Sequence, residues 1–463
     1  MTYHTDTIVA LSTPPGLGAV GVIRISGTRA IEIVNAVFKG KNLLQQASHT
    51  LHFGKIVHEQ QIIDEVIVGI FLAPTSYTKE NIAEISCHGS PYILQKVIEV
   101  LIKNGARSAK PGEFTMRAFL NGRFDLSQAE AVADLIAADS EIAHKTAMQQ
   151  MRGGFSLEIK RLREELIHFA SLIELELDFG EEDVEFADRM ALSATIEQLL
   201  RTIYALSASF KVGNVIKKGV PVVLAGRPNA GKSTLLNALV NEERAIVSNI
   251  AGTTRDIIEV PINIDGLTFR LIDTAGIREA SDTIEAIGVK KTFEQIENAA
   301  ILLYIFDAND LSELEVLEDI NKLNNSKLTI VLVANKCDLC QEHTLGTLEN
   351  SINKLTKNAF PIFEISAHKQ QNIHQLKAYL TSALGINSYL NDNTLVTNIR
   401  HFEALNNCYL SLEKVSLALQ NKITTDFLAQ DIRHALSALS EITGSITTED
   451  LLDNIFSKFC IGK

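Results

Sequence analysis

The sequence has no apolar run that approaches the roughly 18 residues of a membrane-spanning helix. Its longest such run, residues 299–306, has the length of a strand. The N-terminus lacks a basic region followed by an apolar core, so we expect no signal peptide. These absences predict a soluble, cytoplasmic protein.

Cysteines are few, and their number is odd. An odd number at irregular spacing argues against a disulfide scaffold and indicates a reducing compartment. One pair forms a C-x-x-C, but its first member lies inside a nucleotide-binding motif, so we expect neither metal nor redox use there. The five residues are Cys87, Cys337, Cys340, Cys408 and Cys460.

Positive charge is in deficit: 43 Lys and Arg face 56 Asp and Glu, a net charge of -13. Because nucleic-acid phosphates repel such a surface, the charge disfavours unaided nucleic-acid binding over the whole surface. A local basic patch or a basic partner could still deliver a nucleic acid. Hydrophobic residues make up 46% of the chain, enough for packed cores and against disorder.

The stretch Gly226–Ser233 reads G-x-x-x-x-G-K-S, the phosphate-binding loop. It follows an apolar run at 220–225 and precedes a helical run at 234–240, which is the context this motif requires. Backbone N–H groups and a helix N-terminus point at the bound phosphates. Lys232 adds positive charge for the β- and γ-phosphates, and the Ser233 hydroxyl can bind Mg²⁺.

Two further features lie on the phosphate side of the predicted site. Asp273–Gly276 reads D-T-A-G and ends a predicted strand. Its Asp can bind Mg²⁺ through water, and its Gly amide can face the γ-phosphate. Thr253 and Thr254 lie between the two motifs, where a hydroxyl can complete the Mg²⁺ shell.

Two motifs point to the base. Asn335–Asp338 reads N-K-C-D, and its carboxylate can accept hydrogen bonds from the two donors on the edge of guanine. Adenine lacks both donors, so binding it would leave a buried acid unpaired. Ser366 and Ala367 can back the base. Each motif alone is also compatible with an ordinary turn or strand end, but all of them in this order indicate a GTPase.

The residue after D-T-A-G is unusual for a switch GTPase. Ras-like proteins have a Gln there that orients the attacking water, and this chain has Ile277, which cannot. We therefore expect a polar substitute among Arg278, Glu279, Asp282 and Glu285.

The hydrophobic pattern predicts α/β structure before residue 120. We expect strands at 8–11, 20–25, 51–57, 62–72 and 82–87, and helices at 31–38 and 92–104. The G-x-G-x-x-G at Gly16–Gly21 is followed by an alternating strand pattern rather than a helix, so we interpret it as a turn and not a dinucleotide site.

From Asp125 the period becomes helical, with a capping box predicted at Ser127–Glu130. Residues 220–385 alternate strand and helix, which predicts a parallel sheet. Helical patterns return after residue 388. The fold class is thus α/β plus all-α, with a Ras-like P-loop GTPase domain inserted into a helical domain. The predicted domains are 1–120 (α/β), 121–215 (helical, first part), 216–385 (GTPase) and 386–463 (helical, second part).

Five stretches together resemble the MnmE (TrmE) family of tRNA-modifying GTPases, over essentially the whole chain. Two of them lie outside the GTPase domain, which separates this family from Era-like relatives. The stretches are Gly226–Ser233, Ala245–Asp256, Asp273–Glu279, Leu120–Ala131 and Phe459–Lys463.

The resemblance implies GTPase domains that dimerise across the nucleotide when K⁺ is bound, with K⁺ in place of an arginine finger. The K⁺ ligands would be Asn229, Ser248, Ile250 and Thr253, although the family has Thr where this chain has Ser248. Glu285 would orient the catalytic water, and Ser233 and Thr254 would bind Mg²⁺.

The motifs and the resemblance give a full set of expected GTP contacts. They are Asn229, Ala230, Gly231, Lys232, Ser233, Thr234, Ser248, Asn249, Ile250, Ala251, Gly252, Thr253, Thr254, Asp273, Thr274, Ala275, Gly276, Asn335, Lys336, Asp338, Ser366 and Ala367. His368 stands where Lys or Arg is frequent in the family.

For the N-terminal domain the resemblance implies a constitutive homodimer that binds 5-formyltetrahydrofolate or another tetrahydrofolate one-carbon carrier. Arg24, Glu84, Arg123 and Lys463 match folate-contacting positions. An ordinary ion pair on neighbouring strands remains an alternative for Arg24 and Glu84. Cys460 would act near the folate as a catalytic nucleophile or redox thiol, or would simply pack.

The implied reaction adds a carboxymethylaminomethyl or aminomethyl group to C5 of the wobble uridine of certain tRNAs. It uses a one-carbon unit from folate, glycine or ammonium, and an FAD- and NADH-dependent MnmG (GidA) partner in a heterotetramer. One alternative is an Era-like GTPase switch in ribosome assembly, but no RNA-binding module follows the GTPase domain. Another is a folate-dependent one-carbon enzyme that GTP only regulates.

Overall fold

The computed structural model describes residues 6–178, 189–241, 259–273, 299–310, 313–323, 328–340, 360–385, 394–421 and 425–462. The chain divides into two compact units. Unit 1 comprises Met1–Ile136, Gln149–Leu200 and Asn407–Lys463, and unit 2 comprises Ala137–Met148 and Arg201–Asn406. The domain boundaries expected near residues 120, 215 and 385 stay predictions.

Unit 1 contains a seven-stranded sheet in the order β3-β4-β5-β6-β2-β1-β7. Neighbouring strands are antiparallel except β1 and β7, which are parallel. The strands are β1 Thr7–Leu11, β2 Val20–Ser26, β3 Phe38–Lys39, β4 Thr50–His58, β5 Gln61–Phe71, β6 Ile82–His88 and β7 Ala106–Ser108. The five expected strands are confirmed, including β2, which begins in the glycine-rich motif as the alternating pattern predicted.

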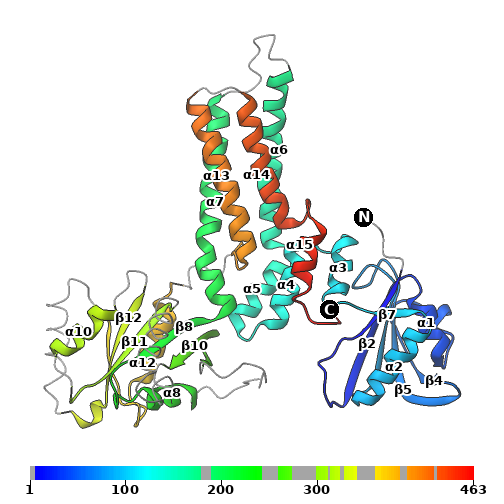
Figure 1. Cartoon of the computed structure of the whole chain (residues 1–463), viewed down its shortest axis with the longest axis horizontal. Coiled ribbons are helices and arrows are strands. Elements are labelled where there is room, and N and C mark those ends of the chain that lie inside the picture. Colours follow the sequence, from blue (N-terminus) through cyan, green and yellow to red (C-terminus); the bar gives the residue numbers. More distant parts are fainter. Residues whose placement is uncertain are drawn as a thin grey trace, which may run out of the picture. The chain divides into compact units, whose positions relative to one another are not determined.

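Two helices, α1 (Ala30–Val37) and α2 (Pro91–Lys103), lie over this sheet (Figure 1). Their apolar residues share one core with alternate residues of the strands, such as Ile23 and Ile25 of β2. The alternation arises because successive side chains of a strand point to opposite faces. The apolar residues of the strands and of both helices thus bury one face of this sheet.

The rest of unit 1 is helical. Helices α6 and α14 lie side by side (Figure 1), and the Nε of Arg163 donates to the Oγ of Ser440 over 3.0 Å between them. The bounds are α3 Glu113–Leu120, α4 Leu126–Ala137, α6 Gly154–Asp178, α14 Thr425–Thr443 and α15 Glu449–Phe456. Four helices have residues in both units: α4, through its last residue Ala137, and α5 Glu141–Met151, α7 Arg189–Lys218 and α13 Ile399–Gln420.

Helix α4 begins with a reciprocal cap, but not the expected one. The Oδ1 of Asp125 accepts from the backbone N of Gln128 over 3.1 Å, and the Oε1 of Gln128 accepts from the backbone N of Asp125 over 3.0 Å. The capping box predicted at Ser127–Glu130 is therefore wrong by two residues. An Asp can cap as well as a Ser, and here the carboxylate also accepts from the Ser156 hydroxyl of α6.

Unit 2 contains a six-stranded sheet in the order β13-β12-β11-β8-β10-β9. The strands are parallel except β9, which pairs antiparallel with β10. Their bounds are β8 Val220–Ala225, β9 Glu259–Ile264, β10 Leu267–Asp273, β11 Ile301–Asp307, β12 Thr329–Asn335 and β13 Ile362–Glu364. The expected parallel strands are confirmed, and β9 was missed.

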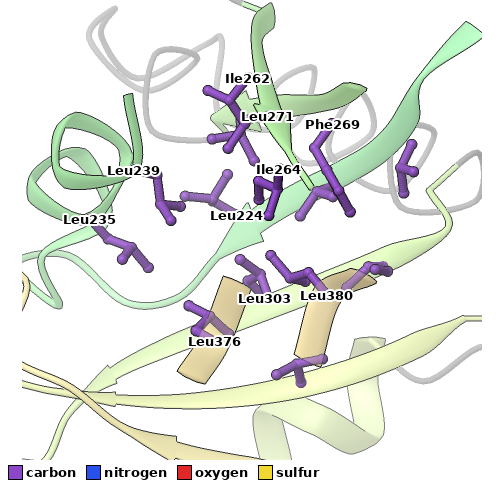
Figure 2. Close-up of a cluster of buried hydrophobic side chains, with 14 of the residues drawn as sticks. Leu224, Leu235, Leu239, Ile262, Ile264, Phe269, Leu271, Leu303, Leu376 and Leu380 are labelled. Atoms are coloured by element: carbon purple, nitrogen blue, oxygen red, sulfur yellow. The ribbon is translucent and has the colours of Figure 1, made fainter. Parts of the chain in front are cut away.

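Helices cover both faces of this sheet. Helices α8 (Lys232–Asn241) and α12 (Ile373–Ser382) pack on one face, where Leu224 and Leu303 contact the same cluster as Leu235 and Leu376 (Figure 2). Helix α10 (Glu313–Leu323) packs on the other face. The arrangement brings the carboxyl ends of the parallel strands to one edge, where ligands of such folds bind.

None of the helices in the described ranges combines the length and the apolar character needed to cross a bilayer.

Candidate functional site

The phosphate-binding loop links β8 to α8, and two of its glycines cannot be replaced without displacement of their neighbours. Gly226 has φ 148°, and a Cβ there would lie 2.0 Å from the carbonyl oxygen of Ile305. Gly231 has φ 91°, and its Cβ would lie 2.2 Å from the Nδ2 of Asn335. The sequence motif therefore reflects close backbone approach as well as turn geometry.

Lys232 is the first residue of α8, and its side chain folds back over the loop. Its Nζ donates to the carbonyls of Gly226 and Arg227 over 2.8 and 3.0 Å. Ser233 and Thr234 are exposed in the first helical turn, next to N–H groups that no helical carbonyl satisfies. With the positive end of the helix dipole, these groups form an anion-binding surface.

Asn335, the last residue of β12, joins the phosphate side of the site to the base side. Its side chain is 2% exposed. Its Nδ2 donates to the carbonyl of Ala230 over 2.9 Å, and its Oδ1 accepts from the amide of Ala367 over 3.0 Å. The sequence predicted Asn335 as a nucleotide contact, which stays a prediction, and did not reveal these two backbone contacts.

Asp338 lies in a 3₁₀ turn at Cys337–Leu339. A hydrogen bond from Ser366, and then one from Lys369, hold the pKa of the Asp338 carboxyl below its usual range. Lys369 Nζ lies 3.4 Å from the carboxylate. Asp338 therefore stays ionised and can accept two hydrogen bonds from a purine edge.

Lys336 precedes this turn in a left-handed conformation, with φ 64°. Its Nζ lies 2.7 Å from the Oδ2 of Asp307 at the end of β11. The ion pair fixes the start of the turn against the neighbouring strand.

These elements line one cavity of about 470 Å³, within the size range of small-molecule sites. Six of the expected GTP contacts line this cavity, and Ala367 is not among them. The cavity also includes His368, which departs from the family pattern, and Lys369, which the sequence analysis missed. The lining residues are Gly231, Thr234, Asn335, Lys336, Asp338, Leu339, Ser366, His368 and Lys369.

Arg227 holds the loop to α10, a role that no motif signals. Its Nη1 lies 2.7 Å from the Oε1 of Glu315, and its Nε lies 2.9 Å from the Oδ2 of Asp319. The Tyr304 hydroxyl donates to the same Asp319 oxygen over 2.6 Å. Hydrogen bonds to both acids raise the pKa of Arg227, and burial raises that of Tyr304.

Asp273 ends β10 opposite Leu224 of β8, beside the strand that leads into the loop. The expected switch contacts, with the water-orienting residue, lie outside the described residues, so their roles stay predictions. They are Ser248, Asn249, Ile250, Ala251, Gly252, Thr253, Thr254, Thr274, Ala275, Gly276 and Glu285, and the other candidates for the polar substitute, Arg278, Glu279 and Asp282, also lie there. Within the described ranges, no group of three or more His, Cys, Asp or Glu could hold a metal.

A second cluster forms in unit 1. Arg24 on β2 pairs with Glu84 on β6, with 2.8 Å between Nη2 and Oε1. The Arg24 and Arg123 guanidinium carbons lie 5.1 and 5.5 Å from the centroid of the Tyr77 ring, and the Tyr77 hydroxyl lies 2.9 Å from that of Thr115. Two of the expected folate residues, Arg24 and Arg123, thus contact the ring of Tyr77, which the sequence did not reveal as part of this cluster.

The C-terminal segment packs against the start of the chain. The backbone N of Gly112 donates to the carbonyl of Cys460 over 3.3 Å. A Cβ on Gly462 would lie 2.1 Å from the carbonyl oxygen of Leu11. The Cys460 side chain is exposed, and Lys463 lies outside the described residues.

Known proteins match this chain along its whole length. Residues 126–460 match the family described as MnmE helical domain, and residues 7–123 match GTP-binding protein TrmE N-terminus. A tRNA modification GTPase MnmE from Cytophaga hutchinsonii is 54% identical, over 100% of this chain and 99% of its own length. The namesake from Flavobacterium psychrophilum is 50% identical, over 100% of both chains.

A solved structure of Era from Aquifex aeolicus, bound to GDP and aluminium fluoride, covers 41% of this chain and 66% of its own. The TM-score is 0.30 at 27% identity, so this partial match does not bear on function. The full-length matches show that the chain belongs to the MnmE (TrmE) family of tRNA modification GTPases.

Proposed function

We propose that this protein is a K⁺-activated GTPase that modifies C5 of the wobble uridine in certain tRNAs together with an FAD- and NADH-dependent MnmG (GidA) partner. One observation carries the nucleotide part. The phosphate-binding loop, Asn335, Asp338 and Ser366 meet at one cavity. Family membership supports the tRNA part.

The loop residues account for phosphate binding. Lys232 exchanges its carbonyl contacts for phosphate oxygens, and the N–H groups at the start of α8 donate to the same anion. At the other end, the ionised Asp338 accepts from the guanine edge, while adenine would leave that carboxylate unpaired.

The donors near the loop suit hard cations. The exposed Ser233 hydroxyl and the Asp273 carboxylate supply oxygens of the kind that Mg²⁺ takes, with Thr254 proposed on the switch side. Asn229, exposed at φ 63°, offers an amide oxygen for K⁺, with Ser248, Ile250 and Thr253. When bound, these cations supply positive charge to the transferring phosphoryl group. Glu285 orients the attacking water.

The Tyr77 cluster suits a tetrahydrofolate. A ring flanked by two guanidinium groups offers stacking and cationic contacts to a flat heterocycle that carries carboxylates. We assign Arg24, Glu84, Arg123 and Lys463 to this ligand. The exposed thiol of Cys460 lies in the same C-terminal segment as Lys463.

An exposed apolar surface supports the proposed homodimer. Phe53 of β4 and Ile67 of β5 lie opposite each other in register, and both are exposed, as is Leu51. Burial of such a patch against a second copy would remove it from water.

With a net charge of -13, the protein would leave most tRNA contact to a basic partner in the cytoplasm.

The test is GTP turnover of the full chain in KCl and in NaCl, with nucleoside analysis of tRNA from a deletion strain. We expect faster turnover in KCl and loss of the modified wobble uridine. Equal turnover in both salts would contradict K⁺ activation. Unchanged wobble uridine in the deletion strain would contradict the assigned modification.

A further inference from the structure

The turn that carries Asp338 has a cysteine at each end. The backbone N of Cys340 donates to the carbonyl of Cys337 over 3.3 Å, which closes a four-residue turn. The first and last Cα atoms of such turns lie within about 7 Å. A disulfide bridges Cα atoms about 4.4–6.8 Å apart, so the backbone allows a bond between these residues.

Each thiol contacts a backbone carbonyl beside this turn. The Cys340 Sγ lies 3.9 Å from the carbonyl of Lys336, the residue before Cys337. Cys337 Sγ also lies 3.1 Å from the carbonyl of Ala334. Both thiols are half-buried at the edge of the core on the α10 face of the sheet, where a small reagent can reach them. Cys87 and Cys408 are buried instead.

We propose that Cys337 and Cys340 form a reversible disulfide that weakens guanine-nucleotide binding. The sequence alone predicts no redox use of this pair, because its first cysteine lies inside the N-K-C-D motif. The turn geometry changes that expectation, since one backbone hydrogen bond closes the turn between the two cysteines while Asp338 lines the cavity. The inference rests on the proposed binding of GTP at this site.

A low-molecular-weight disulfide such as oxidised glutathione serves as the oxidant. The Cys340 thiolate attacks one glutathione sulfur, which forms a mixed disulfide and releases one glutathione thiolate. Cys337 then loses its proton to solvent and attacks the Cys340 sulfur, which releases the second glutathione. Two protein thiols and one oxidised glutathione thus give one protein disulfide and two reduced glutathiones.

The bond would disturb the base site. The two sulfurs of a disulfide lie about 2 Å apart, so formation of the bond draws Cys337 away from the Ala334 carbonyl and Cys340 away from the Lys336 carbonyl. Ala334 precedes Asn335, whose amide fixes the loop and the Ala367 backbone. Binding sites lose affinity when such groups move by about 0.5 Å or more.

Burial raises the pKa of the Cys337 thiol to about 12, and that of Cys340 is also raised, chiefly by burial. Few thiolates are therefore present at neutral pH. The oxidation should be slow at pH 7 and should speed up as the pH rises toward 9, because the thiolate is the attacking species.

The experiment equilibrates the full chain in glutathione buffers and maps disulfides by mass spectrometry after alkylation. The Kd for a fluorescent GDP analogue is then measured for the reduced and oxidised forms. We expect a Cys337–Cys340 bond that dithiothreitol reverses, and a Kd raised about tenfold by oxidation. Reciprocally, saturating GDP should shift the midpoint potential by about 30 mV toward easier reduction.

Cys340→Ser should make the oxidised and reduced Kd values equal, whereas Cys408→Ser should leave their ratio at about tenfold. Mixed glutathione adducts without an internal bond, or a bond that leaves Kd within about twofold, would overturn the inference. If the reduced protein binds no GDP at all, the proposed function fails with it. If the reduced protein binds GDP normally and only the redox response is missing, the inference alone is wrong.

Discussion

The hydroxyl of Ser12 donates a hydrogen bond of 3.2 Å to the carbonyl of Gly462, which joins residues 450 positions apart. Ser12 follows β1, whose Ala10 lies opposite Arg24 of β2 in register. The last described residues of the chain therefore lie beside the end of β1, whose neighbour β2 carries Arg24. The contact joins the segment that contains Cys460 to the sheet that contains the proposed folate residue Arg24.

Gly462→Ala should release this segment. Gly462 has φ 94°, and an added Cβ would lie 2.1 Å from the Leu11 carbonyl oxygen, so the native backbone cannot be kept. We expect loss of tRNA modification in a complemented deletion strain, with GTP turnover near normal. Ile461→Ala, at an exposed neighbour, is the matched control. Full modification with Gly462→Ala would show that the docked segment is dispensable.

Asp338→Asn should shift nucleotide preference from guanine to xanthine. The substituted amide offers a donor where the carboxylate accepts, and xanthine presents an acceptor at that position. We expect GDP affinity to fall by about tenfold or more while affinity for xanthosine diphosphate rises. Competition binding measures both. Asp310→Asn, an exposed carboxyl outside the cavity, should leave the order unchanged, and retained guanine preference in Asp338→Asn would refute the base assignment.

Arg227→Ala should loosen the phosphate-binding loop. The arginine is partly exposed, so its ion pairs with Glu315 and Asp319 are screened by solvent. We therefore expect GTP binding to weaken by only about two- to fivefold. If Arg227 acts through α10, Asp319→Ala should weaken binding similarly, and the double variant should add little. Additive losses would mean that the two residues act separately.

Tyr77→Ala should weaken binding of 5-formyltetrahydrofolate by about tenfold, because the ring between the two guanidinium groups is lost. Tyr77→Phe keeps the ring and removes only the hydroxyl that contacts Thr115. It should therefore retain most of the affinity. Isothermal titration calorimetry with the full chain measures both. Equal losses in the two variants would assign the effect to the hydroxyl instead.

Glu113→Gln should destabilise the N-terminal sheet. Glu113 and Arg117 side chains are each 2% exposed and lie 3.1 Å apart. Although burial by itself would raise it, hydrogen bonds from Arg107 and the Lys110 amide lower the pKa of Glu113 overall. Removal of the charge leaves Arg117 underpaired, at a cost of about 3 kcal/mol.

The lowered pKa of Glu113 predicts how the stability of the protein changes with pH. A carboxyl whose pKa is lowered by folding stabilises the protein above its unfolded pKa, and that stability disappears as pH falls through the folded pKa. Wild type should therefore lose protection of β1 amides as pH falls below about 4.5, and Glu113→Gln should lose less there. Glu32→Gln, in an exposed pair, is the control. An unchanged pH profile in Glu113→Gln would contradict the role of this carboxyl.

Local patterns were sufficient for much of the fold. The apolar run before the phosphate-binding loop and the helical run after it predicted β8 and α8 nearly to the residue. Strand β9 was missed because Pro261 interrupts its pattern. The structure tolerates that proline because β9 lies at the sheet edge, where a missing N–H donor costs little.

The sequence could predict those residues of the candidate site that belong to a motif of fixed spacing. Gly231, Lys232 and Asp338 belong to spaced motifs, so the sequence named them. Tyr77 and Arg227 act through partners that only folding brings together, such as Arg24 for Tyr77 and Asp319 for Arg227. No spacing rule connects such residues, so sequence reasoning could not find them.

The carboxamide of Asn335 connects the segment proposed to contact the purine with the loop proposed to bind the phosphates. It holds the Ala230 carbonyl with its nitrogen and the Ala367 amide with its oxygen. A base that does not fit and displaces Ala367 would therefore also displace the phosphate-binding loop. A wrong nucleotide would then bind weakly and would also be hydrolysed slowly, because the loop that positions its phosphates has moved.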